Sequence, residues 1–122
     1  MSNIKSPEKE IGQLLKIIQP VPRLKLLLAI GHREACVCHL EARLGYRQAY
    51  ISQHLMALRK AKLLLTRREG RYIYYRLAKP AILEVLGEIA QLIGIPAEEF
   101  TAHLQSDPLP QCCCPHCGDQ SK

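Results

Sequence analysis

The spacing of apolar residues changes once along an otherwise helical chain, and this change limits the folds that the sequence can adopt. Apolar residues recur at intervals of three and four along most of the sequence, and prolines and glycines interrupt this helical pattern. Residues 63–77 differ, because two short strand-like runs flank Gly70, which can adopt the positive φ of a tight hairpin turn. We therefore expect one β-hairpin among helices. The expected helices cover residues 8–18, 22–30, 35–44, 47–61, 81–93 and 96–104.

The two helices that precede the hairpin are short and are joined at Gly45-Tyr46. Two such helices followed by a basic hairpin form a helix-turn-helix with a wing. The fold class that we predict is mostly α with a small β-hairpin wing, a winged helix-turn-helix. With 122 residues the chain suffices for one domain. We expect this domain to cover residues 8–105, between a flexible N-terminal tail at 1–7 and a cysteine-rich tail at 106–122.

Positive charge is concentrated in the hairpin and the helix before it. Residues 43–79 carry ten basic side chains and one acidic side chain, whereas the net charge of the whole chain is only +6. A polyanion favours such a block, since each Lys or Arg that binds a phosphate releases counterions. On charge alone, a solvated basic face is the alternative.

The helix at 47–61 carries the polar groups that could read DNA. Its expected buried stripe of Ile51, Leu55 and Leu58 leaves polar side chains for base edges. These candidates are Gln48, Tyr50, Ser52, Gln53 and His54. Basic candidates for phosphate contacts flank the helix or lie at the hairpin tip: Arg43, Arg47, Arg59, Arg67, Arg68 and Arg71. The alternatives are an ordinary solvated helix face and, for His54, a structural role.

Motifs between residues 20 and 77 recur in a recognisable order. They are Pro22-Arg23-Leu24, Ala35-Cys36-Val37-Cys38-His39-Leu40, Gln48-Ala49-Tyr50-Ile51-Ser52-Gln53-His54-Leu55, Leu58-Arg59-Lys60-Ala61 and Arg68-Glu69-Gly70-Arg71-Tyr72-Ile73-Tyr74-Tyr75-Arg76-Leu77. Together they resemble the ArsR/SmtB family of metal-responsive winged-helix repressors. The resemblance implies a homodimer, built mainly from the first and last long helices, that binds a palindromic operator and leaves it when an inducer binds. The apolar stripe at 82–93 is the dimer candidate, with burial in its own subunit as the alternative.

The six cysteines fall into two separated clusters. No apolar run approaches the ~20 residues that span a bilayer, and the first residues contain no apolar signal region, so we expect a cytoplasmic protein without membrane contact. In a reducing compartment, clustered thiols are more often metal ligands or redox groups than disulfides.

Cys36-Val37-Cys38 matches the sensor motif of the family's third helix. Residues at i and i+2 do not share a helix face, so the two thiols can converge only at the start of the helix, where the thiolate is favoured. His39 replaces the family's usual Asp and could be a ligand or a structural residue. Glu41 replaces a third Cys found in some arsenic-responsive members, so this motif provides two thiolates. Arg47, at the start of the next helix, stands where the family often has a capping Ser.

The tail provides a second set of candidate ligands. These are Cys112, Cys113, Cys114 and Cys117, together with His116. The tail could complete the Cys36/Cys38 site, form a separate site or be an appendage without a ligand. Soft thiolates select thiophilic ions, here As(III) or Sb(III), or else Cd(II), Pb(II) or Zn(II).

The predicted function is a transcriptional repressor that binds double-stranded operator DNA and is released by a thiophilic metal(loid) ion bound to cysteine thiolates. A repressor that senses oxidants or sulfide species through its thiols is the main alternative. A metal-buffering protein is a weaker one. The sequence contains no Gly-rich phosphate loop, H-E-x-x-H motif or catalytic triad, so we expect no enzyme, and we expect no RNA partner.

Overall fold

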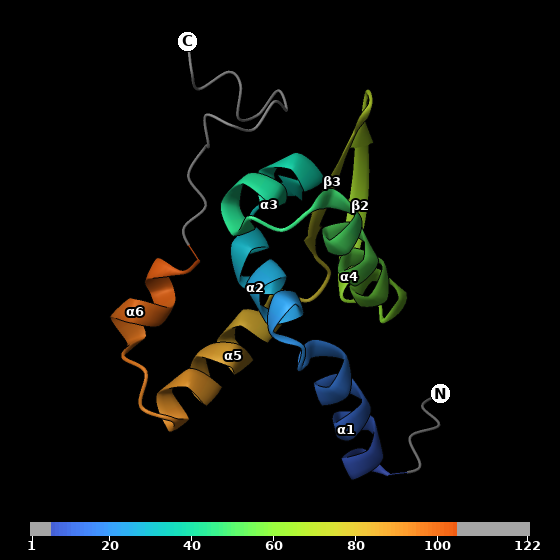
Figure 1. The fold of residues 1–122 in the computed structure, drawn as a ribbon. Coiled ribbons are helices and arrows are strands. Elements are labelled where there is room, and N and C mark those ends of the chain that lie inside the picture. The colour runs from blue at the N-terminus through green and yellow to red at the C-terminus, as the bar shows by residue number, and fades with distance from the viewer. Residues whose placement is uncertain (1–5, 105–122) are drawn as a thin grey trace.

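The computed structural model describes residues 6–104 and has the predicted helical chain with a single wing (Figure 1). Its elements are α1 (Pro7–Ile18), α2 (Val21–Ile30), β1 (Ala35–Cys36), α3 (Val37–Leu44), α4 (Gln48–Lys60), β2 (Leu64–Glu69), β3 (Tyr72–Leu77), α5 (Ala81–Leu92) and α6 (Ala97–Ala102). The predicted fold class is thus confirmed. The cysteine-rich tail lies outside the described residues. None of the helices across residues 6–104 has the length and apolar character needed to traverse a bilayer.

Two glycines make the turns that define the DNA-binding motif. Gly45 ends α3 with a φ of +77°, in the left-handed region, and its N–H donates to the carbonyl of Glu41. Gly70 has a φ of +63° and, with Arg71, connects β2 to β3. The hairpin is therefore tighter than the sequence predicts, because β2 continues through Arg67 and Arg68 to Glu69.

One part of the third predicted helix is a strand. Ala35 and Cys36 form β1, which pairs antiparallel with Tyr75 and Tyr74 of β3, and α3 begins only at Val37. The expectation of a helix from residue 35 is therefore wrong by two residues. The sheet has the order β1-β3-β2, so β3 lies in the middle of three strands.

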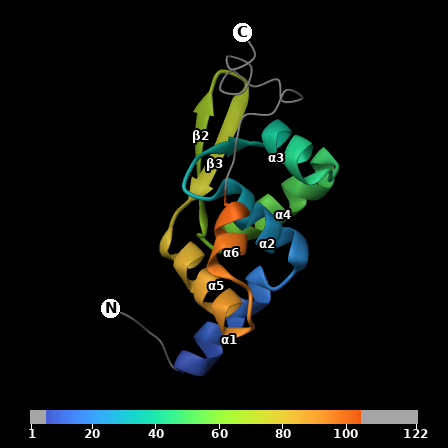
Figure 2. The same ribbon diagram turned by 90° about the vertical axis from the view of Figure 1, so that its left-hand side faces the viewer.

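The core lies where α2, α3, α4 and the base of the wing meet. Its fully buried side chains are mainly leucine and isoleucine: Leu26, Leu27, Ile30, Leu40, Ile51, Leu55 and Leu58. The predicted stripe of α4 is therefore confirmed as part of the core. Helix α1 and the wing tip lie at opposite ends of the molecule (Figures 1 and 2).

The apolar stripe of α5 divides between the core and the surface. Four of its residues are buried in the subunit: Ile82, Leu83, Leu86 and Ala90. The remaining large side chains of this region are exposed: Val85, Ile89, Leu92 and Ile93. Burial within its own subunit thus accounts for only part of this stripe.

Candidate nucleic-acid interface and thiol pocket

Helix α4 presents its polar residues on the side away from the core. Gln48, Tyr50 and Gln53 are exposed, and Ser52 is half-buried. Arg47 occupies the N-cap position in an extended conformation and provides no side-chain hydrogen bond to the first turn. The N–H groups at the start of α4 therefore lack the side-chain cap that a Ser would give. A phosphate is one group that can bind such a helix start.

His54 is held by contacts within the protein. Nε of Arg23, in α2, donates to Nδ1 of His54 over 3.0 Å, while Nη1 of Arg23 donates to the carbonyl of Ile17 over 2.9 Å. The His54 ring packs edge-to-face on Tyr50, with ring centroids 4.7 Å apart. Partial burial and the Arg23 charge lower the pKa of His54. Arg23, which the sequence analysis did not single out as a functional residue, thus links the end of α1 to α4.

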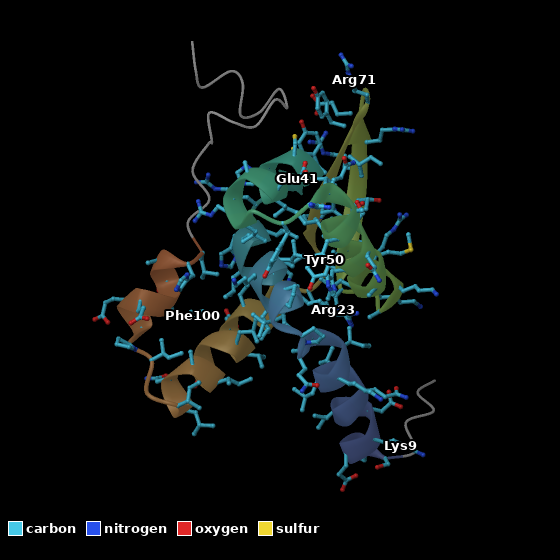
Figure 3. The ribbon with its side chains drawn as sticks, in the orientation of Figure 1. Lys9, Arg23, Glu41, Tyr50, Arg71 and Phe100 are labelled. Carbon is cyan, nitrogen blue, oxygen red and sulfur yellow. The ribbon has the colours of Figure 1, made fainter. Side chains whose placement is uncertain are left out.

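The three wing arginines have different surroundings. Arg68 and Arg71 are exposed near the turn, and Arg71 extends from the tip (Figure 3). Arg67 instead forms salt bridges of 2.7 Å with both Glu34 and Glu69. The three were predicted together as DNA contacts. No local pattern indicates that Glu34, which lies 33 residues from Arg67, binds it.

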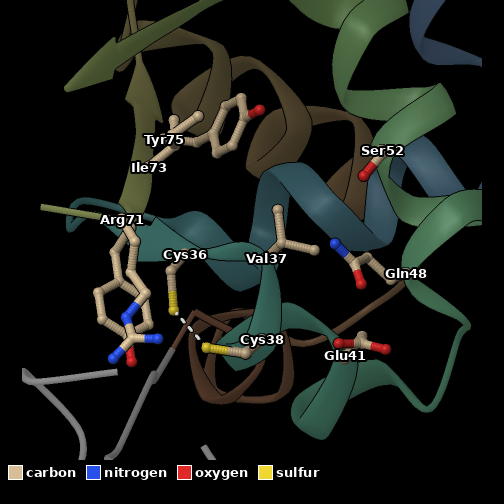
Figure 4. A pocket seen from close by; sticks show the side chains of 10 residues that line it. Cys36, Val37, Cys38, Glu41, Gln48, Ser52, Arg71, Ile73 and Tyr75 are labelled. Carbon is tan, nitrogen blue, oxygen red and sulfur yellow. Dashed lines mark hydrogen bonds between the residues drawn. The ribbon is translucent and has the colours of Figure 1, made fainter. Parts of the chain in front are cut away.

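Cys36 and Cys38 converge at the start of α3. Cys36 is the N-cap residue in an extended conformation, and its Sγ accepts a hydrogen bond of 3.4 Å from the N–H of His39. The two Sγ atoms lie 3.0 Å apart (Figure 4). Residues at i and i+2 meet here because the first lies in a strand and the second in a helix. His39 itself is buried, and burial, with a smaller contribution from Arg43, lowers its pKa.

The two thiols line a pocket of about 350 Å³ that they share with the candidate DNA-binding elements. Its walls include Glu41 of α3, Gln48 and Ser52 of α4, and Arg71 of the wing (Figure 4). Within residues 6–104 no cluster of three His, Cys, Asp or Glu side chains is placed to hold a metal ion. The other predicted ligands lie outside the described residues: Cys112, Cys113, Cys114, His116 and Cys117.

Comparison with known proteins agrees with this architecture. Residues 22–64 match the family model described as "Bacterial regulatory protein, arsR family". The biofilm growth-associated repressor of Agrobacterium fabrum is 36% identical over 91 residues, which cover 75% of this chain and 78% of that protein. The chain belongs to the ArsR family. As a member of this family it is a DNA-binding transcriptional regulator and not an enzyme.

Two further relatives of this ArsR-family protein have names that state the class of ligand to which they respond. The arsenical resistance operon repressor of Escherichia coli K12 is 42% identical over 67 residues, which cover 54% of this chain and only 57% of that repressor. The crystal structure of the antimony-specific repressor AntR is 31% identical and covers 76% of this chain and 86% of its own, with a TM-score of 0.63.

Proposed function

We propose that this ArsR-family protein is a homodimeric operator-binding repressor that a thiophilic metal(loid) ion releases from DNA. The observation that carries this proposal is the shared pocket. Cys36 and Cys38 lie in the same cavity as Gln48 and Ser52 of the reading helix and Arg71 of the wing. A ligand bound to the thiols would therefore contact the elements that bind DNA.

The proposed DNA contacts follow the exposed groups of α4 and the wing. Gln48 and Gln53 are suited to base edges, since an amide side chain can both donate and accept. Tyr50, Ser52 and His54 are proposed to support the same surface, with His54 held by Arg23. The proposed phosphate contacts are Arg43, Arg47, Arg59, Arg68 and Arg71. Arg67 differs from these and is treated separately below.

The proposed dimer interface combines the exposed apolar residues of α1 and α5. A groove of about 480 Å³ between these helices is lined by residues that include Leu15, Ile18, Leu86 and Ile89. Large exposed apolar patches of this kind mark association sites. A two-fold dimer would also place two copies of α4 against two half-sites of a palindromic operator.

The proposed ion site needs donors beyond the Cys36/Cys38 pair. As(III) and Sb(III) take three thiolates, and Cd(II), Pb(II) or Zn(II) take three or four donors of sulfur or nitrogen. The tail beyond residue 105 is proposed to supply them from Cys112, Cys113, Cys114, Cys117 and His116. Arsenical and antimony repressors among the relatives support a metal(loid) of this class.

Chain length supports this role for the tail. A Cβ atom at Gly31 would lie 3.2 Å from the carbonyl oxygen of Leu104, so the described chain ends beside Gly31. The five residues from Gly31 to Cys36 span at most about 18 Å, and the eight from Leu104 to Cys112 can span about 28 Å. The segment from Leu104 to Cys112 is therefore long enough to cover this distance.

The proposed mechanism is a coupling between two ligands of one protein. An ion that draws Cys36, Cys38 and the tail together would alter the pocket wall that Gln48, Ser52 and Arg71 also form. The arrangement that binds the ion best would then fit the operator less well. Linkage requires that DNA weaken ion binding by the same factor.

The test is a titration of the reduced protein on fluorescent DNA from its own promoter with arsenite, antimonite, Cd(II), Pb(II) and Zn(II). We expect release by at least one of these ions at micromolar concentration. The double variant Cys36→Ser/Cys38→Ser and a chain truncated after Pro110 should both lose this response while still binding DNA. No release of wild type by any ion would contradict the proposal. If the double variant is still released from DNA by an ion, then the tail cysteines alone form the sensor.

A thiol-redox repressor is the second candidate, and the 3.0 Å separation of the two sulfurs favours it. Two thiols can form a disulfide by giving two electrons and two protons to an oxidant such as peroxide, which becomes water. If peroxide or polysulfide releases DNA and no ion does, this candidate replaces the first.

A further inference from the structure

A row of side chains crosses the sheet from the thiol pocket to the outer strand of the wing. Cys36 of β1 pairs with Tyr74 of β3, and Tyr74 pairs with Arg67 of β2. Residues that are directly paired in a sheet project to the same face. Cys36 and Tyr74 are both buried and pack in one cluster. The row therefore begins at the candidate sensor thiol and ends at an arginine of the wing.

Arg67 also binds the segment that leads into β1. Its Nε donates to Oε2 of Glu34 over 2.9 Å and its Nη2 donates to Oε1 over 2.7 Å. Its third nitrogen, Nη1, donates to Glu69 over 2.7 Å, and its guanidinium carbon lies 4.9 Å from the centre of the Tyr74 ring. Glu34 lies two residues before Cys36. The two-pronged Arg67–Glu34 pair thus connects the strand that carries the thiol to the outer wing strand.

These contacts distinguish Arg67 from its neighbours on the wing. All three nitrogens of its guanidinium donate to carboxylate oxygens, and two carboxylates lie around the one positive charge. The two negative charges outweigh the single positive charge, so this arginine is poorly placed to bind a phosphate. Arg68 and Arg71 remain as the proposed phosphate contacts at the tip.

We propose that Arg67 is a positioning residue that transmits ligand binding at Cys36 to the wing, and that it does not contact DNA. The transmission part rests on the proposed function. A ligand that shifts Cys36 moves β1, and the carboxylate of Glu34, the residue before this strand, moves with it. Because Nε and Nη2 of Arg67 both donate to that carboxylate, β2 of the wing moves together with β1. Without the Arg67–Glu34 salt bridge, β1 could move while the wing stays in its DNA-binding position.

The test compares Arg67→Met, Arg67→Lys and Glu34→Gln with a matched control, Arg68→Met. Operator affinity is measured without ion and with saturating arsenite, antimonite or Cd(II), and its salt dependence is measured without ion. We expect Arg67→Met and Glu34→Gln to keep the ion-free affinity within about threefold and the salt slope unchanged. The ratio of the dissociation constants with and without ion should fall about tenfold, within the usual range of coupling.

Of the two remaining variants, Arg67→Lys tests whether the geometry of the side chain matters in addition to its charge. Arg68→Met shows how the loss of a phosphate contact changes binding. Arg67→Lys keeps the charge but loses the planar fork, so its coupling ratio should also fall. Arg68→Met should weaken binding equally in both states and reduce the salt slope by about one for each subunit of the dimer. Glu34→Gln changes little in shape, and therefore keeps the test valid if Arg67→Met fails to fold.

Each contrary outcome has a distinct meaning. An Arg67→Met variant that behaves like Arg68→Met would make Arg67 a DNA contact and overturn the proposal. A wild type that responds to an ion, together with an unchanged ratio in Arg67→Met and Glu34→Gln, would overturn the transmission alone. A wild type that responds to none of the ions would overturn the proposed function and the transmission with it, while the salt slope would still decide whether Arg67 contacts DNA.

Discussion

Helices α1 and α4 carry similar apolar patterns, yet only α4 buries its whole stripe. In α4, Ile51, Leu55 and Leu58 are each 0% exposed. In α1, the matching residues Ile11 and Leu15 are 56% and 46% exposed, and only the third, Ile18 at the end of the helix, is buried. The same spacing therefore specifies a helix in both places, but it does not specify what covers the apolar face.

The exposed faces of the two helices differ just as clearly. Helix α4 turns polar groups such as Gln48 and Gln53 outward, which suits a nucleic acid. Helix α1 leaves apolar groups beside the equally exposed Ile89 of α5, which suits a second apolar surface. The apolar face of α4 is covered within its own subunit. We propose that the apolar face of α1 is covered by a second copy of the chain.

The largest expected effect follows from truncating the same residue type in each helix. Leu55→Ala removes a fully buried side chain and should lower the free energy of unfolding by about 2–5 kcal/mol. Leu15→Ala should lower it by less than about 1 kcal/mol, because Leu15 is not enclosed by its own subunit. Urea unfolding at a protein concentration where sedimentation shows a monomer measures both. Equal losses would mean that α1 is part of the monomer core.

The second prediction introduces charge on the exposed face of α1. The variant Leu14→Glu/Leu15→Glu should raise the dimer dissociation constant at least about hundredfold, since it would bury carboxylates in an apolar interface. Far-ultraviolet circular dichroism should stay unchanged. Met56→Glu is the control, because Met56 is 65% exposed on α4, away from the proposed interface. Sedimentation velocity across a concentration series measures the constant. A Leu14→Glu/Leu15→Glu variant that dimerises like wild type would place the interface elsewhere.

Local sequence patterns were sufficient to predict some parts of the structure and not others. The helices, the hairpin and the buried stripe of α4 could be predicted, because periodicity and glycine positions are local signals. The strand β1 could not, since Ala35 and Cys36 are too few to show alternation and become a strand only by pairing with β3. The salt bridge between Arg67 and Glu34 could not be predicted either, because only the folded sheet brings these two residues together. The meeting of Cys36 and Cys38 agrees with the prediction that thiols at i and i+2 can converge only at the start of a helix.

A smaller effect is expected on the polar face of α4. Gln48→Ala should cost about 1–3 kcal/mol in affinity for the operator and less for unrelated DNA, as loss of a base contact would. The slope of affinity against salt should not change. Gln48 also lines the thiol pocket, so Gln53→Ala serves as a matched variant that tests the reading face alone. Fluorescence anisotropy with operator and scrambled DNA measures the difference. An equal loss on both DNAs would argue that Gln48 does not read bases.

The smallest expected effect concerns His54, where α4 meets Arg23. The lowered pKa of His54 means that the folded protein favours the neutral ring, so its contribution to stability is complete above the ordinary pKa of about 6.5. That contribution is lost as the pH falls below this value toward the lowered pKa, because a protonated Nδ1 cannot accept the hydrogen bond from Arg23. His54→Gln keeps an acceptor that does not titrate, whereas His54→Phe keeps a ring without one. Urea midpoints measured from pH 8 to pH 5 should therefore fall less in His54→Gln than in wild type. In His54→Phe they should start lower and also fall less. If His54→Gln and wild type lose stability in parallel, then the Arg23–His54 contact does not contribute to the pH dependence.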